Sequence, residues 1–182
     1  VVGYMLEGMS LLAEGVTPAL IDNAGRLAGM PMGPLRLTDM VNIDLIERIE
    51  AQTAEDLGAE YIPNPGRPVG QALLAAGRKG EKAGAGFYDY GAEGPTLWPG
   101  LTDLYPPAAT QPDAATLAQR LMLRQAAETL RCFDDGVLTS AADADVGSVL
   151  GWGFAPHTGG VAGYVDRIGA AKQSAVQKCC QN

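Results

Sequence analysis

Apolar residues recur every three or four positions through most of the chain, and glycine or proline interrupts each run. This is the period of an amphipathic helix, with proline near its start and glycine just past its end. The pattern predicts helices over residues 1–13, 18–28, 35–57, 69–76, 112–133 and 140–151, and a last one ending near Cys179. No two segments alternate as paired strands do, so the sequence predicts an all-α fold.

The longest predicted helix, residues 35–57, is expected to turn one apolar stripe toward the core. The stripe consists of Leu37, Met40, Val41, Leu45, Ile46 and Ile49. An apolar turn, Met30-Pro31-Met32-Gly33-Pro34, precedes this helix, and its two prolines fix the backbone and remove two amide donors. The turn is therefore expected to present a stiff, dry surface.

The composition divides the chain into two helical domains. Residues 93–111 are rich in proline, glycine and threonine without periodicity, which is typical of a linker. We therefore predict a first domain over residues 1–92 and a second over residues 112–182.

Two sets of residues recur in the same order in both domains, which indicates a duplication. At a spacing of 121 residues the pairs are Glu7 and Glu128, Gly15 and Gly136, and Asp22 and Asp143; at 127 residues they are Gly33 and Gly160, and Asp39 and Asp166.

Because one domain of about 70 residues would be marginal alone, the two are expected to pack as an internal pseudo-dimer. The first helix of each would face the other about a pseudo-twofold axis. Further association between copies of the chain is left open.

Charge and composition argue against several classes of function. The net charge is −8 and the pI about 4.5, which argues against a nucleic-acid partner. A single histidine, His157, cannot supply a histidine-rich metal site, so no metal is expected. No apolar run approaches the length of a membrane span. Three cysteines, two of them adjacent, indicate reduced thiols and a cytoplasmic location.

Several motifs in order resemble the C-terminal helical domain of the 3-hydroxyacyl-CoA dehydrogenase family, which is 6-phosphogluconate dehydrogenase C-terminal-domain-like. They are Tyr4-Met-Leu-Glu-Gly8, Glu14-Gly-Val16, Ile21-Asp22, Gly29-Met-Pro-Met-Gly-Pro34, Asp39, Asp44 and Lys82-Ala-Gly-Ala-Gly-Phe-Tyr88. The second half is similar to the second copy of that domain in multifunctional fatty-acid oxidation proteins and long 3-hydroxybutyryl-CoA dehydrogenases. Its motifs are Asp143-x-Asp145, Gly151-Trp-Gly-Phe-Ala-Pro156, Gly159-Gly160 and Tyr164-x-Asp166.

The resemblance implies an NAD-dependent oxidation of 3-hydroxyacyl-CoA to 3-oxoacyl-CoA in fatty-acid β-oxidation. In the family an N-terminal Rossmann domain binds NAD and carries a His–Glu pair, and an asparagine lies about three residues before the position of Val1. None of these is in this sequence: Gly80 to Gly86 does not follow a strand as a dinucleotide fingerprint would. The chain is therefore expected to be a fragment that binds no cofactor and is inactive alone.

The candidate substrate-binding residues are those of the turn, Met30, Pro31, Met32, Gly33 and Pro34. Flexible thioethers and prolines make an adaptable apolar wall for an acyl chain, although the methionines could equally be core residues. No residue is assigned a catalytic role.

Other polar residues are given structural interpretations. We expect His157 to be a packing or surface residue, and the basic cluster Arg78, Lys79 and Lys82 to lie in a solvated loop rather than bind CoA phosphates. Asp39 and Asp44, five residues apart, do not share a helix face well; Asp39 is expected to accept hydrogen bonds from a facing turn.

Two other functions remain open at this point. The chain could be a stand-alone, non-catalytic helical dimerisation or scaffold module. It could also belong to another group with this helical domain, such as the 6-phosphogluconate-type dehydrogenases, although the turn from Gly29 to Pro34 argues against this.

Overall fold

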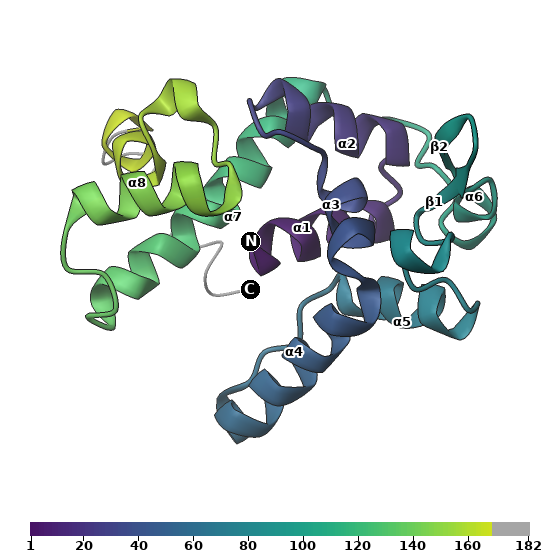
Figure 1. Ribbon diagram of the computed structural model, residues 1–182, viewed down its shortest axis with the longest axis horizontal. Coiled ribbons are helices and arrows are strands. Elements are labelled where there is room, and N and C mark those ends of the chain that lie inside the picture. Colours follow the sequence, from purple (N-terminus) through teal and green to yellow (C-terminus); the bar gives the residue numbers. More distant parts are fainter. Residues whose placement is uncertain (169–182) are drawn as a thin grey trace.

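A computed structural model describes residues 1–168, and most of them are helical (Figure 1). The first half contains five α-helices and two 3₁₀ turns. These are α1 (Val2–Ala13), α2 (Pro18–Leu27), α3 (Pro34–Val41), α4 (Ile43–Leu57), η1 (Gly58–Glu60), α5 (Arg67–Ala75) and η2 (Glu81–Ala83). The remaining elements are β1 (Tyr88–Gly91), β2 (Gly94–Leu97), α6 (Gly100–Leu104), α7 (Ala114–Asp134), α8 (Ala141–Trp152) and η3 (Pro156–Thr158), with residues 161–168 also helical.

The first helix, α1, is the centre of the molecule. Every residue from Tyr4 to Leu12 is buried, and α2, α3, α5 and α7 all pack against it. A helix that is buried on all sides needs neighbours on all sides, and one of them, α7, comes from the second half of the chain. The mostly helical fold that the sequence predicted is confirmed.

The predicted helix over residues 35–57 is two helices instead of one. Asn42 separates α3 from α4, with φ at 83° and ψ at 129°, a conformation that rarely suits a residue with a side chain. The break changes which residues face inward: Ile43 and Ile46 are buried, whereas Met40 and Leu45 are more than two-fifths exposed. The predicted buried stripe is therefore wrong at Met40 and Leu45 and right at Ile46.

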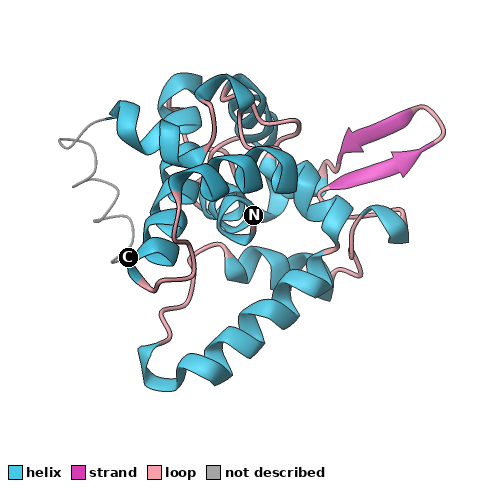
Figure 2. Ribbon diagram, turned by 60° about the vertical axis from the view of Figure 1, so that its left-hand side comes forward, coloured by secondary structure: helices cyan, strands magenta, loops and turns pink. Residues whose placement is uncertain are grey.

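The segment predicted to be an irregular linker has structure of its own. Strands β1 and β2 form an antiparallel hairpin, with Tyr88 opposite Leu97 and Gly91 opposite Gly94, and α6 follows. Figure 2 shows this hairpin extending from the helices. The chain then returns to the first half, where the Gln111 side chain bonds both Thr17 N and Gly15 O, at 3.0 and 2.9 Å.

The duplication is visible as one repeated hydrogen-bonding arrangement. In the first half Asp22, on α2, accepts hydrogen bonds from Leu35 N and Arg36 N at the start of α3, at 2.8 and 3.1 Å. In the second half, Asp145 on α8 accepts from the amides of residues 162 and 163, at 2.8 and 3.0 Å. The counterpart of Asp22 is thus Asp145, and the predicted pairing with Asp143 is wrong. The reason is the length of the turn before each helix. The turn between α7 and α8 is two residues longer than the turn between α1 and α2.

The first helices of the two halves, α1 and α7, pack against each other, while the predicted pseudo-twofold arrangement stays a prediction. Arg120 on α7 makes ion pairs with two carboxylates of the α1 segment, to Glu7 Oε1 at 2.5 Å and to Glu14 Oε1 at 2.6 Å. The hydrogen bonds that Arg120 donates to Glu14, together with the charge of Glu7, raise the pKa of Arg120, although burial lowers it. The domain limits 1–92 and 112–182 stay a prediction, and the helix predicted to end near Cys179 lies outside the described residues.

We expect Gly33→Ala to lower the free energy of unfolding by about 2 kcal/mol. An added Cβ would overlap Cγ and Cα of Asp22, which cannot move without losing its bonds to α3. Gly147→Ala is the matched control, because a Cβ there meets no atom of the described chain within 4 Å. Helix propensity predicts that this control gains about 0.5–1 kcal/mol. Urea denaturation measures both, and a loss of equal size in the two variants would contradict the prediction.

Candidate functional site

The turn Met30–Pro34, predicted to contact substrate, lies between α2 and α3 and is held from two sides. Met30 is buried, and the Gln125 side chain of α7 donates to its sulfur at 3.8 Å. The Met32 carbonyl accepts a hydrogen bond from Tyr4 Oη at 2.9 Å. Gly33 and Pro34 are buried against α1 and α2. Pro31 is exposed and Met32 half-buried, so these two residues carry the accessible surface of the turn.

The loop after α8 packs on the same turn. A Cβ added at Gly153 would lie 2.8 Å from Pro31 Cγ, and one at Gly29 would lie 2.8 Å from His157 Cε1. His157 is exposed, with its ring lying against Gly29, which agrees with a packing or surface role. The second half therefore fixes the position of the turn.

A buried carboxylate anchors the Gly-Phe-Tyr motif. Asp39, fully buried on α3, accepts hydrogen bonds from Phe87 N at 2.8 Å, Tyr88 N at 2.9 Å and Tyr90 Oη at 2.7 Å. Gly86 has no Cβ, and a Cβ there would overlap the Asp39 carboxylate. Burial raises the pKa of Asp39, although these three donors and Arg36 lower it. The structural role predicted for Asp39 is the one the structure shows.

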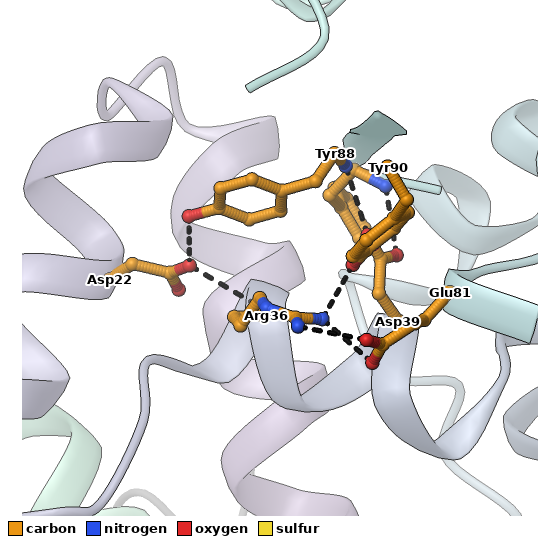
Figure 3. A network of polar contacts seen from close by, with 7 residues as sticks. Asp22, Arg36, Asp39, Glu81, Tyr88 and Tyr90 are labelled. Atoms are coloured by element: carbon orange, nitrogen blue, oxygen red, sulfur yellow. Dashed lines mark hydrogen bonds and ion pairs between the residues drawn. The ribbon is translucent and has the colours of Figure 1, made fainter. Parts of the chain in front are cut away.

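A second carboxylate, Asp22, holds the same segment from the other side (Figure 3). Tyr88 Oη donates to Asp22 Oδ2 at 2.6 Å, in addition to the two amides of α3. Burial raises the pKa of Asp22 to about 6, against the opposing effect of these three donors. Burial, followed by the charge of Asp22, also raises the pKa of Tyr88. Both tyrosines of β1 therefore donate to carboxylates as neutral phenols.

Two arginines complete this network. Arg36 bonds both oxygens of Glu81, at 2.9 and 3.1 Å, and donates to Tyr90 Oη at 2.8 Å. The hydrogen bond from Arg36 lowers the pKa of Glu81. Arg78 bonds the carbonyls of Gly86 and Tyr88, at 2.6 and 3.2 Å, and its guanidinium lies 4.1 Å from the centre of a Trp98 ring. Arg78 is thus part of the fold, and the prediction that it lies in a solvated loop is wrong because its side chain packs under the Gly-Phe-Tyr segment.

The other residues that the sequence analysis named as candidates do not lie together in one site. Lys79 and Lys82 are exposed, as a solvated loop predicts. Asp44 pairs with Arg48 one turn further along α4, at 2.6 Å, and takes no part in the Asp39 network. Within residues 1–168 no group of three or more histidine, cysteine or acidic residues is arranged to hold a metal ion. No helix of that part is long and apolar enough to cross a membrane.

A cavity of about 570 Å³, which the sequence did not predict, lies between the start of α1, the end of α4 and α7. Its lining mixes apolar side chains such as Leu6 and Leu57 with charged ones such as Glu50, which accepts a hydrogen bond from Tyr61 Oη at 3.0 Å. Three segments far apart in the sequence form it, so no local motif could have revealed it. Its charged lining differs from the mainly apolar walls of most ligand pockets.

Taken together, the described residues form a helical domain that offers an apolar turn on a rigid support. Asp22 and Asp39 each accept three hydrogen bonds from groups inside the protein, which suits anchoring rather than proton transfer. Residues 1–90 match the family described as 3-hydroxyacyl-CoA dehydrogenase, C-terminal domain. This part of the chain belongs to that family.

Curated relatives extend the match over nearly the whole chain. Fatty acid oxidation complex subunit alpha from a Shewanella species is 37% identical over 175 residues, and that from Shewanella baltica is 36% identical over 172. Each alignment covers 92% of this chain and 24% of the relative, so the chain spans about a quarter of their length.

Two solved structures share the fold. The dehydrogenase part of multifunctional enzyme 1 from C. elegans aligns with a TM-score of 0.65 and 22% identity, over 83% of this chain and 35% of that one. The 3-hydroxybutyryl-CoA dehydrogenase from Escherichia coli aligns with a TM-score of 0.59 and 23% identity, over 84% and 48%. The predicted fold class and the predicted family are both confirmed.

We expect Asp39→Ala to destabilise the chain by about 3 kcal/mol, because two buried amides and a tyrosine hydroxyl lose their acceptor. Asp166→Ala is the matched control, since Asp166 holds the corresponding position in the second half but is exposed. That variant should stay within about 0.5 kcal/mol of the parent. Thermal denaturation followed by circular dichroism compares them, and a stable Asp39→Ala protein would show that other contacts hold the Gly-Phe-Tyr segment.

The raised pKa of Asp22 gives stability a defined dependence on pH. Because the folded-state pKa, about 6, lies above the ordinary 3.8, the carboxyl adds stability below pH 3.8 that is lost as the pH rises through 6. At about 1.4 kcal/mol for each unit of pKa, the full loss is about 3 kcal/mol.

The measurement is the free energy of unfolding of the parent and of Asp22→Asn at about pH 4.5 and about pH 7.5. The parent should gain more than the variant on going to the lower pH, while groups common to both proteins cancel. A larger gain for the variant would mean that the three hydrogen bonds outweigh burial.

Proposed function

We propose that this chain is the helical substrate-cleft and dimerisation region of an NAD-dependent 3-hydroxyacyl-CoA dehydrogenase of fatty-acid β-oxidation. The enzyme would oxidise 3-hydroxyacyl-CoA to 3-oxoacyl-CoA. The observation that carries the proposal is the family match over residues 1–90, extended by relatives that are fatty acid oxidation complex alpha subunits. The proposal includes a cytoplasmic location, in keeping with the reduced thiols that the cysteine pattern indicates.

NAD supplies the hydride acceptor of such an enzyme, and the residues of this chain do not fit it. The glycine-rich loop from Gly80 to Gly86 closes on Asp39, and a Cβ at either end would overlap atoms of that residue. The loop is therefore filled by the protein itself and has no room to cradle a pyrophosphate. NAD and the histidine, glutamate and asparagine of the family are assigned to parts of the enzyme outside this chain.

The work of this chain would be to shape the cleft and exclude water from it. We assign the acyl-binding wall to Met30–Pro34, and within it the contacts to Pro31 and Met32. Pro31 is exposed and Met32 half-buried, while the rest of the turn is packed. Met30 and Gly33 would hold the wall in place. Met30 contacts the Gln125 side chain, and Gly33 lies directly against Asp22.

The two halves would form the internal counterpart of a dimer. Contacts between α1 and α7, and the ion pairs of Arg120 with Glu7 and Glu14, support this pairing. The second half would hold the turn in place, since Met30, Pro31 and Gly29 all lie against it. Its own turn would be structural, because Phe154 is fully buried there and packs edge-on against Tyr164.

We expect the longer protein that carries this segment to reduce NAD with 3-hydroxyacyl-CoA substrates, and Met32→Ala to change its chain-length preference. A smaller side chain at the wall should alter the ratio of kcat/KM for long and short acyl chains by about threefold or more. The measurement is the appearance of NADH with short- and long-chain substrates. The isolated 182-residue chain should produce none.

Phe154→Ala is the control. This variant should lower the melting temperature by emptying a buried site, and should leave the preference between long and short chains unchanged. If Met32→Ala behaves the same way, the turn is core and the binding assignment is wrong. If the longer protein does not act on any 3-hydroxyacyl-CoA, the enzymatic proposal itself fails.

A further inference from the structure

Gln125, a buried polar residue of α7, joins two segments that belong to different halves of the chain. Its side chain lies among the apolar core residues of that helix. Its Oε1 atom accepts a hydrogen bond from Trp152 Nε1 at 3.1 Å, and its Nε2 atom donates to the sulfur of Met30 at 3.8 Å. Trp152 is the last residue of α8, and Met30 begins the turn Met30–Pro34. We call the chain Trp152–Gln125–Met30 the Gln125 bridge.

The chemistry of the three groups gives the bridge one orientation. An indole N–H can only donate, so the end of the amide that faces Trp152 is its oxygen. The amide nitrogen then faces the Met30 sulfur, which can only accept, and the Leu121 carbonyl at 3.3 Å. Trp152 therefore determines which way the Gln125 amide is turned, and Gln125 in turn holds the Met30 side chain.

The duplication places this bridge beside a second anchor of the same turn. By the 121-residue spacing that pairs Glu7 with Glu128, Gln125 corresponds to Tyr4. The Tyr4 hydroxyl donates to the Met32 carbonyl at 2.9 Å. Equivalent positions of the two halves thus hold the same turn, one by its backbone and the other by a side chain. The Gln125 anchor differs in that it also bonds the end of α8.

Met30 is the point at which the bridge acts on the turn. Met30 is buried, whereas Pro31, which follows it, is exposed and Met32 is half-buried. A methionine side chain is unbranched and has three rotatable bonds, so it takes other rotamers when nothing holds its sulfur. A shift of Met30 would move Pro31 and Met32, the two residues assigned to contact an acyl chain.

We propose that Gln125 is a positioning residue that fixes the acyl-binding wall through Met30, so that chain-length preference depends on the second half of the chain. This proposal rests on the proposed function, because the wall is assigned there. Gln125 itself would not touch substrate. A wall released from the bridge leaves more room, so its loss should favour longer acyl chains.

The kinetic test uses the longer protein that carries this segment. Gln125→Leu keeps a side chain of similar size and removes both hydrogen bonds, while Trp152→Phe keeps an aromatic ring and removes only the N–H donor. Each variant should raise the ratio of kcat/KM for long over short chains by about threefold. Because both break the same bridge, the double variant should raise the ratio no further than either single one.

Ser148→Ala is the matched control. Ser148 is fully buried on α8 and accepts a hydrogen bond from Val161 N at 3.1 Å, but takes no part in the bridge. Its loss should lower the melting temperature, because a buried amide loses its acceptor. The ratio for long over short chains should stay that of the parent. An equal rise of the ratio in Ser148→Ala would overturn the proposal, since loss of stability alone would then explain the effect.

A second readout needs no activity and uses the 182-residue chain. The sequence has two tryptophans, and Trp152→Phe identifies which indole N–H resonance in the NMR spectrum belongs to Trp152. Gln125→Leu should shift that resonance, because the proton loses the amide oxygen as its acceptor. Ser148→Ala should leave it in place. An unchanged resonance in Gln125→Leu would show that the bridge does not form, and would overturn the proposal.

Met32→Ala separates this proposal from the proposed function. If Met32→Ala changes chain-length preference and Gln125→Leu does not, the wall assignment stands and the role of Gln125 is wrong. If neither variant changes the preference, the wall assignment has failed, and the role of Gln125 fails with it.

Discussion

The burial of α1 on every side is the constraint on which the rest of this structure depends. Nine consecutive residues, Tyr4 to Leu12, are shielded from water, among them the carboxylate of Glu7. A buried carboxylate needs a partner, and Arg120 of α7 provides it. The first half alone would leave α1 open along the side where α7 lies. The two halves are therefore parts of one core, although each repeats the same local arrangement.

Two buried carboxylates hold the segments around α3 together. Asp22 ties α2 to α3 and to Tyr88, while Asp39 ties α3 to the backbone of Phe87 and Tyr88. Their hydrogen bonds join segments up to 66 residues apart in the sequence. Because the Gly-Phe-Tyr segment is held at fixed points on both helices, the start of α3 and the turn before it are also fixed. The rigidity of the proposed substrate wall thus comes from groups that would not touch substrate.

The sequence predicted the helices that glycine and proline delimit, and missed the features that no such residue marks. The end of α1 follows from Gly15 and the start of α2 from Pro18, and α8 ends at Trp152, one residue beyond the predicted end at residue 151. The break at Asn42 does not, because an asparagine inside an amphipathic pattern is compatible with a continuous helix. The hairpin was missed because its strands have only four residues each, too few to show a period.

The candidate site was predictable to a similar extent. The turn Met30–Pro34 and the anchoring role of Asp39 follow from local motifs. Which residues of the turn reach the surface depends on α7 and on the loop around Gly153, about 100 residues or more away in sequence. The counterpart of Asp22 was misplaced because Asp143 and Asp145 are the same residue type, and only hydrogen bonds distinguish them.

The corresponding aspartates Asp39 and Asp166 have consequences for how such a protein can change. In a dimer of identical subunits, every substitution appears at two equivalent places, so a residue needed at one place is retained at both. A duplication within one chain removes that coupling. Asp39 is tied to three donors, while Asp166 is exposed. The two halves of one chain can thus differ at equivalent positions, so that one keeps a buried hydrogen-bonding network while the other has a different surface.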